Sequence, residues 1–155
     1  MKRRQKKREP ESPSALQVIN AYTAAMAARD STRMESLRAD GFQLDFVHGD
    51  ASQTDPLSAE ETRMFWSFWF VAFPDLDWEV TRAIAAENVV VTQWVFTGTN
   101  SGPLDPSILG SVEEPTGITI QLRGASFYDV NEGLIQRETA YLDMATLMVE
   151  LGVQL

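Results

Sequence analysis

The chain has 155 residues, of which 44% are hydrophobic and 23% charged, and this suffices for one globular domain with a buried core. It has no cysteine and one histidine, which excludes disulfides, thiolate chemistry and multi-histidine metal sites. No apolar run approaches the roughly 20 residues that cross a bilayer. We therefore expect no metal, no cofactor and no membrane partner.

The first 13 residues form a basic tail. Six of the 13 Lys and Arg residues lie between Lys2 and Arg8, within a net charge of −9 for the whole chain. The tail lacks apolar residues after Met1, which predicts disorder and excludes a secretory signal. The rest of the chain is strongly acidic, so contact with a polyanion could begin only in the tail. We favour a solvated tail, one domain over residues 14–155, no nucleic-acid partner and a cytoplasmic location.

Two helices and a strand are predicted next, over residues 14–29, 31–38 and 42–48. We expect Ser31 to cap the second helix. Tyr22 lies on the apolar stripe of the first helix, either as core or with its phenol directed into a pocket. His48 ends the strand and is the one side chain with an unperturbed pKa near neutrality, so it is structural, exposed or part of a pocket.

Residues 58–73 are predicted to form the most apolar helix. Ser58 and Glu61 make a capping box, in which each side chain bonds the backbone of the other residue. The body of the helix, MFWSFWFVAF, is apolar almost all round, which predicts burial. Trp66, Trp69 and Phe70 are either core residues or the lining of an apolar pocket.

Strands are predicted over residues 77–87, 88–99, 116–131 and 134–143, with a loop at 101–116. In the turn between the last two strands, Asn131 and Gly133 are the residues expected to accept positive φ. Asp143 is expected to cap a closing helix, and Gly152 to end it. Helices followed by a mostly antiparallel sheet indicate an α+β fold.

Three segments together resemble one known family. The run EGLIQRETAYLDMATLMVELG, preceded by FPDLDWEV and VVTQWVFTGTNSGPL, is similar to the SnoaL-like polyketide cyclases of the nuclear transport factor 2-like superfamily. The resemblance implies a cone-shaped α+β barrel, in which the helix at 58–73 closes a cavity over the concave sheet. It also implies a hydrophobic small-molecule ligand and a homodimer formed through the convex face of the sheet.

The resemblance leaves the catalytic base open. Characterised cyclases of the family carry an aspartate at the position of Ala140 and a histidine at that of Ser126, and both are absent here. Asn100 likewise stands where the family tends to have histidine. The cyclase mechanism therefore cannot be carried over unchanged.

Glu138 is the candidate replacement, because it lies two residues from Ala140 on the same face of the last strand. Burial in an apolar cavity would raise its pKa toward values suited to acid–base chemistry. The alternative is an ion pair with Arg123 or Arg137 that only stabilises the sheet. Candidate hydrogen-bond donors are Tyr128, Ser126, Gln93 and Asn100. A strict period of two places these residues on the face of Glu138: Leu134, Gln136, Ala140 and Leu142.

Three functions remain open. The chain could be a cofactor-free isomerase, cyclase or epoxide hydrolase that uses Glu138, Tyr128 and Ser126 on a hydrophobic substrate. It could bind a similar ligand without turnover, in keeping with Ala140. It could also be an association domain, which predicts a cavity filled by its own side chains.

Overall fold

The computed structural model describes residues 12–47, 55–104 and 114–152, so most of the basic tail and His48 lie outside the described residues. One six-stranded sheet has the order β2-β1-β6-β5-β4-β3. Neighbouring strands are antiparallel, except that β1 and β6 are parallel. In chain order the elements are α1 (Ala15–Ala27), α2 (Ser31–Ser36), β1 (Arg38–Val47), β2 (Leu57–Ser58), α3 (Ala59–Ala72), β3 (Asp77–Ala86), β4 (Val89–Thr99), β5 (Thr119–Asn131), β6 (Leu134–Leu142) and α5 (Met144–Glu150).

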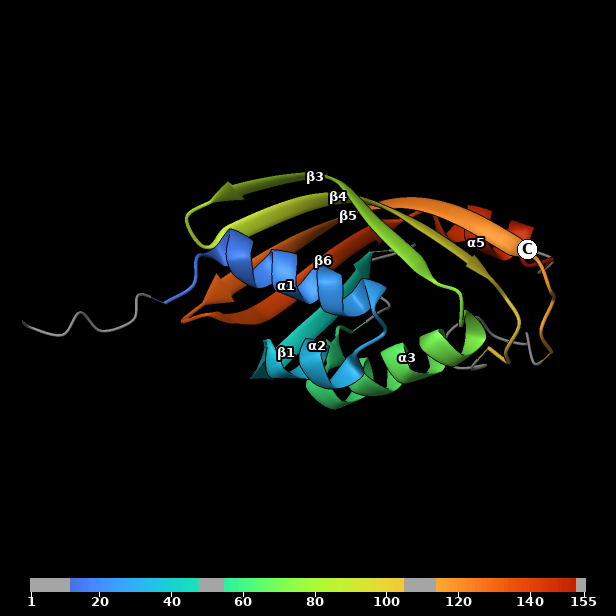
Figure 1. Ribbon diagram of the computed structural model, residues 1–155, viewed down its shortest axis with the longest axis horizontal. Helices are drawn as coiled ribbons and strands as arrows, with labels where there is room; N and C mark the ends of the chain where they lie inside the picture. Colours follow the sequence, from blue (N-terminus) through green and yellow to red (C-terminus); the bar gives the residue numbers. More distant parts are fainter. Residues whose placement is uncertain (1–11, 48–54, 105–113, 153–155) are drawn as a thin grey trace, which may run out of the picture.

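The sheet curves around three helices. Figure 1 shows α1, α2 and α3 on its concave side and α5 at the far end of the sheet. Helix α1 crosses four strands, β3 to β6, whereas α3 contacts β1 and β2. The expected α+β architecture of N-terminal helices on a curved, mostly antiparallel sheet is confirmed.

Ser14 caps helix α1. Ser14 and Gln17 bond each other's backbone N–H, at 3.2 and 2.8 Å. The side chains of Ile19, Tyr22 and Met26 are fully buried against the sheet. The next helix differs from the prediction, because Asp30 caps it by accepting a hydrogen bond from the N–H of Arg33, and Ser31 is its first residue.

Helix α3 has the predicted capping box of Ser58 and Glu61. Its burial is one-sided, which corrects the expectation of a helix buried almost all round. Trp66 and Trp69 are buried, whereas Met64, Phe68 and Val71 are 46%, 41% and 57% exposed. Two of these exposed side chains, Met64 and Phe68, border a cavity between α3 and the sheet.

The β5–β6 turn and its neighbourhood also differ in detail from the prediction. Glu132 and Gly133 have the positive φ values, 50° and 78°, while Asn131 remains in β5. The register of the pair then shifts, so that Ile135 pairs with Val130 and Arg137 with Asp129. This irregularity breaks the period of two and brings Ile135, rather than Leu134, into the core.

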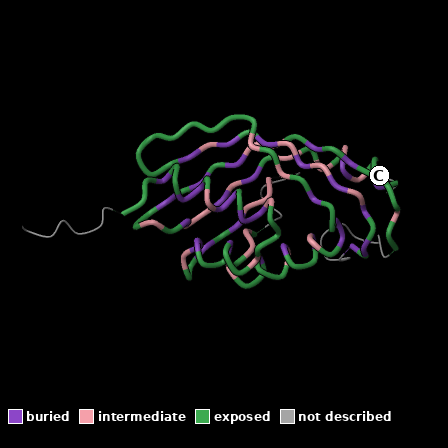
Figure 2. Tube along the Cα trace, in the orientation of Figure 1, coloured by how far each residue is buried: buried purple, intermediate pink, exposed green. Residues whose placement is uncertain are grey.

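Beyond the irregularity the inner face of the sheet is regular. Thr92, Ser126 and Ala140 are cross-strand neighbours on β4, β5 and β6, and all three are buried. The buried segments in Figure 2 follow these strands and the inward side of the helices. The inner face of three adjacent strands therefore forms the floor beneath the helices.

Candidate active site

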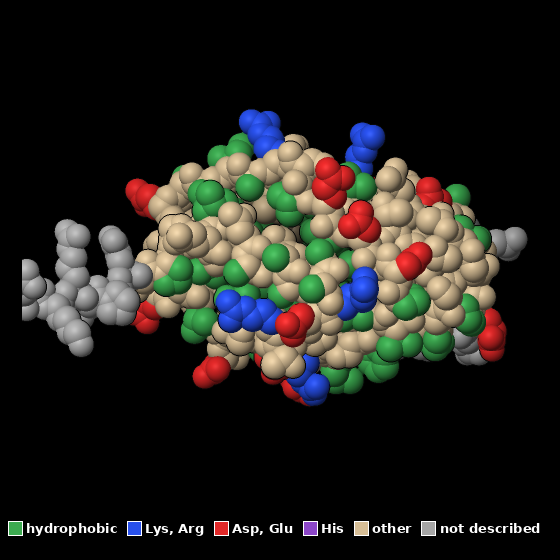
Figure 3. Space-filling model, viewed as in Figure 1, with side chains coloured by type: hydrophobic (Ala, Val, Ile, Leu, Met, Phe, Trp, Pro, Cys, Tyr) green, Lys and Arg blue, Asp and Glu red, His purple; other side chains and the backbone are tan. Residues whose placement is uncertain are grey.

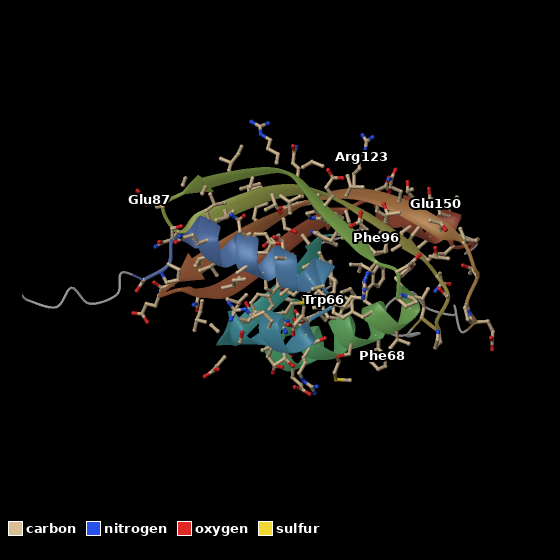
Figure 4. The ribbon with its side chains drawn as sticks, viewed as in Figure 1. Trp66, Phe68, Glu87, Phe96, Arg123 and Glu150 are labelled. Carbon is tan, nitrogen blue, oxygen red and sulfur yellow. The ribbon has the colours of Figure 1, made fainter. Side chains whose placement is uncertain are left out.

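A cavity of about 440 Å³ lies between α3 and the sheet. Its walls are mostly apolar and aromatic, and all four tryptophans of the chain contribute. In Figure 4, Trp66 of α3 and Phe96 of β4 lie between the helices and the sheet. The cavity is not filled by the protein's own side chains, in contrast to the expectation for a pure association domain. The described lining residues are Leu44, Phe46, Asp55, Leu57, Glu61, Met64, Phe65, Trp66, Phe68, Trp69, Trp78, Trp94, Phe96, Leu122, Glu138, Ala140, Leu142, Met144 and Leu147.

Among the described residues, Glu138 is the one carboxylate that is both buried and part of the cavity wall. Its exposed fraction is 2%, whereas the other two acidic lining residues, Asp55 and Glu61, are exposed. Glu138 is flanked across the sheet by Tyr128 of β5 and Leu44 of β1. Strand pairing on both sides of β6 thus fixes the position of Glu138 in the sheet.

One oxygen of Glu138 is engaged and the other is free. The hydroxyl of Ser126 donates a hydrogen bond to Oε1 of Glu138 at 3.0 Å, and Nε1–H of Trp94 donates to the same hydroxyl oxygen at 3.0 Å. Oε2 of Glu138 has no partner among the described residues. The carboxyl group of Glu138 is therefore held in one orientation in the cavity wall, where it can accept or donate a proton.

Burial raises the pKa of Glu138 from its ordinary value of 4.5 to about 7. Three groups oppose this shift: the hydrogen bond from Ser126, the nearby hydroxyl of Tyr128 and the charge of Arg38. Because desolvation dominates, the carboxyl group exchanges protons near neutrality, where an acid–base catalyst is most effective.

Glu138 does not pair with an arginine in the described part of the chain. Arg137 instead bonds Asp45 at 2.7 Å on the outer face of the sheet. Arg123 is exposed and projects away from the helices in Figure 4. The alternative of an ion pair between Glu138 and Arg123 or Arg137 is therefore wrong.

Several other buried polar atoms surround the carboxyl group without a partner among the described residues. They are the hydroxyls of Tyr22, Tyr128 and Thr92 and Nη1 of Arg38. The rings of Tyr22 and Tyr128 meet edge to face, with centroids 6.1 Å apart. Burial raises the pKa of both phenols, so both stay protonated and can donate hydrogen bonds. Buried polar groups are normally satisfied, so these atoms form an unusual polar cluster, which lies behind the lining residues of the cavity.

Six of the predicted site residues lie in the cavity wall or beside it. Glu138, Trp66 and Trp69 line the cavity. Ser126 lies directly behind Glu138, as its hydrogen bond shows. Tyr128 is its buried cross-strand neighbour. Tyr22 contacts Tyr128 from α1.

Three predicted ligand contacts lie elsewhere. Gln93 is exposed, one residue out of phase with the inward-facing Thr92 and Trp94. Phe70 packs its ring 5.7 Å from that of Trp66 but is not a lining residue. Asn100 is buried as a loop anchor, because its side chain donates to the carbonyl of Gly102 and accepts from the backbone of Thr116, at 2.9 Å each.

Sequence reasoning missed Trp94, Trp78 and Arg38. Trp94 could have been found, because it shares the inward phase of β4 with Thr92 and Phe96. Trp78 required the cross-strand register of β3, where an irregularity interrupts the alternation. Arg38 closed a predicted helix and is instead the first residue of β1, buried beside the ring of Phe42.

The family model for SnoaL-like polyketide cyclases matches residues 17–151, so the chain belongs to this family. A candidate SnoaL-like polyketide cyclase from Jannaschia sp. CCS1 has a TM-score of 0.77 and 17% identity, with 97% of this chain and 100% of that chain covered. AclR, a candidate hydroxylase from Streptomyces galilaeus, has a TM-score of 0.75 and 19% identity, with 91% of this chain and 86% of that chain covered. IdmH, a candidate polyketide cyclase from Streptomyces antibioticus, has a TM-score of 0.70 and 24% identity, with 90% of this chain and 99% of that chain covered. Curated proteins gave no match.

These findings confirm the family resemblance and the nuclear transport factor 2-like fold. The family supports a cyclase- or isomerase-type role with a small-molecule substrate in a pocket. Within the described ranges, no helix is long and apolar enough to span a membrane. Among the same residues, no group of three His, Asp or Glu side chains is placed to hold a metal ion.

Proposed function

We propose that the protein is a cofactor-independent isomerase or cyclase that performs acid–base chemistry on a hydrophobic carbonyl compound. The observation that carries this proposal is Glu138: a buried carboxyl group in an apolar cavity, without an arginine partner in the described chain and with one free oxygen. Hydrolysis of an epoxide is a variant of the same chemistry, with a water molecule in place of the carbon acid.

In the proposed reaction, Oε2 of Glu138 removes a proton from the carbon next to the carbonyl group. The electron pair of the broken C–H bond moves into the carbonyl group and forms an enolate. The protonated Glu138 then returns the proton to another carbon atom, which isomerises the substrate. Alternatively, the enolate attacks a second carbonyl group, which closes a ring, and Glu138 returns the proton to the alkoxide that this attack forms. The free hydroxyl of Tyr128 beside Glu138 is the proposed donor to the enolate oxygen.

The charge of the cavity favours a neutral or cationic substrate. Asp55, Glu61 and Glu138 are its charged residues among those described, and all three are acidic. On the face shown in Figure 3, basic and acidic side chains are scattered singly, and no basic patch gathers. A phosphorylated or carboxylated substrate would meet repulsion at this site, and so would a nucleic acid.

The first test follows hydrogen exchange of a simple carbon acid. In D₂O, the protein should accelerate α-hydrogen exchange of 2-tetralone, measured by proton NMR. Glu138→Gln should lower this acceleration at least about a hundredfold, because the amide cannot accept the proton. Asp55→Asn is the matched control, since it makes the same change at an exposed lining residue and should leave exchange intact. Equal rates for Glu138→Gln and the unchanged protein would contradict the role of Glu138.

A second candidate function is ligand binding without turnover. Ala140 lies in the cavity wall two residues from Glu138 and has no proton to exchange, which favours this alternative. The four tryptophans report ligand entry through their fluorescence. If 2-tetralone and related ketones or epoxides quench this fluorescence but are never converted, the binding function replaces the enzymatic one.

We also propose a homodimer in the cytoplasm. Phe127 and Tyr141 support the dimer, because their rings meet edge to face on the outer side of the sheet, with centroids 5.8 Å apart. Both side chains are nearly half exposed, at 46% and 47%. A second copy that covers this outer face would remove them from water.

A further inference from the structure

Trp94 lies behind the catalytic carboxyl group, and its indole is held in one place. The ring of Trp78 stacks on it, with centroids 4.3 Å apart and an interplanar angle of 33°. On another side lies Gly124, its cross-strand partner. A side chain at Gly124 would collide with the indole, because a Cβ atom there would lie 2.2 Å from Cζ2 of Trp94.

This placement directs the indole N–H at Ser126, which is two residues beyond Gly124 on the same face of β5. The indole nitrogen can only donate a hydrogen bond, so the Ser126 hydroxyl must act as the acceptor. The one hydrogen of that hydroxyl then goes to its other partner, Oε1 of Glu138. All three side chains are at most 4% exposed, so bulk water does not compete for these bonds.

We propose that Trp94 is a positioning residue, which fixes the direction of the Ser126 hydrogen bond and thereby leaves Oε2 as the oxygen through which Glu138 exchanges its proton. This assignment deepens the proposed function, since it names the reacting atom. The two hydrogen bonds that run from Trp94 through Ser126 to Glu138, called the relay below, exist whether or not the protein turns over a substrate. It can therefore be tested on the protein alone.

The charged and titratable groups that face Glu138 come from three elements. Tyr22 approaches from α1, Arg38 from β1 and Tyr128 from β5. Burial raises the pKa of both phenols, so they stay protonated while Glu138 titrates. A change in the titration after substitution of Trp94 or Ser126 is therefore caused by the relay.

The experiment is a pH titration of the Glu138 carboxyl group by carbon-13 NMR, with Glu138→Gln used to assign its signal. Ser126→Ala should raise the pKa of Glu138 by about one pH unit, a tenfold change in proton affinity, because the carboxylate loses a charge-assisted hydrogen bond. Trp94→Phe should raise it less, since the hydroxyl remains but can rotate. Gly124→Ala should act like Trp94→Phe by displacing the indole.

Ser67→Ala is the matched control. It makes the same change as Ser126→Ala, but the Ser67 hydroxyl bonds the carbonyl of Arg63 on the exposed side of α3. The titration of Glu138 should stay unchanged in this variant. An unchanged titration in both Ser126→Ala and Trp94→Phe would overturn the proposal, and so would an equal shift in Ser67→Ala.

If Glu138 is not a catalytic base, the two sets of experiments give different results. In that case the relay variants shift the titration as expected, while hydrogen exchange of 2-tetralone is the same with and without Glu138. The positioning role of Trp94 and the catalytic role of Glu138 can therefore fail separately.

Discussion

At the scale of single residues, Glu138 combines two opposed requirements. A carboxyl group buried in an apolar wall is costly when charged, which raises its pKa to about 7. The hydrogen bond from Ser126 stabilises the charged form enough for it to exist at neutral pH. Burial of Glu138 therefore lowers the stability of the protein when the group is charged, but it also provides a proton-transfer group with a pKa near neutrality.

The raised pKa of Glu138 predicts a pH-dependent stability. The folded protein binds the Glu138 proton more tightly than the unfolded chain does, so the stabilisation is complete below about pH 4.5 and is lost as the pH rises through about 7. Relative to Glu138→Gln, the free energy of unfolding should fall by about 3 kcal/mol between about pH 4.5 and pH 8. Urea unfolding of both proteins across this range measures it. A constant difference would show that the carboxyl group titrates normally.

The sequence located Glu138 but not its surroundings. The identity of the candidate base followed from alternation along one strand, which is a local property. The side chains around Glu138 come from β1, β4, β5 and α1, so their placement depends on strand register and helix packing. Gln93 illustrates the limit, because the phase of β4 puts it on the outer face and exposes it.

At the scale of elements, the helix caps were largely predictable. Ser58 and Asp143 cap their helices as predicted, because capping chemistry acts within four residues, whereas Asp30 takes the place expected of Ser31. The β5–β6 pair was less predictable. Its register shift exchanges the roles of neighbouring residues, and a one-residue shift moves a side chain to the opposite face.

The register shift makes a direct prediction about β6. Ile135→Ala should destabilise the protein by about 2–5 kcal/mol, because the fully buried side chain leaves a cavity. Leu134→Ala, the adjacent control, should cost much less, since Leu134 is 37% exposed. Urea unfolding of the two variants compares them. A larger loss in Leu134→Ala would restore the strict alternation that the sequence predicted.

At the scale of the whole molecule, the fold separates two surfaces of one sheet. The concave side carries the cavity and the helices, and the convex side carries exposed aromatic residues. The α+β class and the family could be predicted from the order of elements and three short segments. The family resemblance implied a cavity beneath the helix at 58–73, but its volume and its lining could not be predicted, because they depend on how α3 sits over the sheet.

The proposed dimer belongs to this scale. Phe127→Asp should convert a dimer to a monomer in light scattering, since it places a charge in the apolar interface. Val71→Asp is the control, because Val71 is exposed on α3, away from the outer face of the sheet. A dimer that survives Phe127→Asp, or a monomer before any substitution, would contradict the assigned interface.

The central claim is that Glu138 is the base of a carbon-acid reaction, and its pH–rate profile tests this most directly. The rate of 2-tetralone exchange should rise with pH through an inflection near the pKa of about 7, because only the carboxylate accepts a proton. Glu138→Gln should remove this inflection while tryptophan fluorescence still reports ligand binding. An inflection that persists in Glu138→Gln would assign the chemistry to another group, and the complete absence of exchange would leave a binding protein.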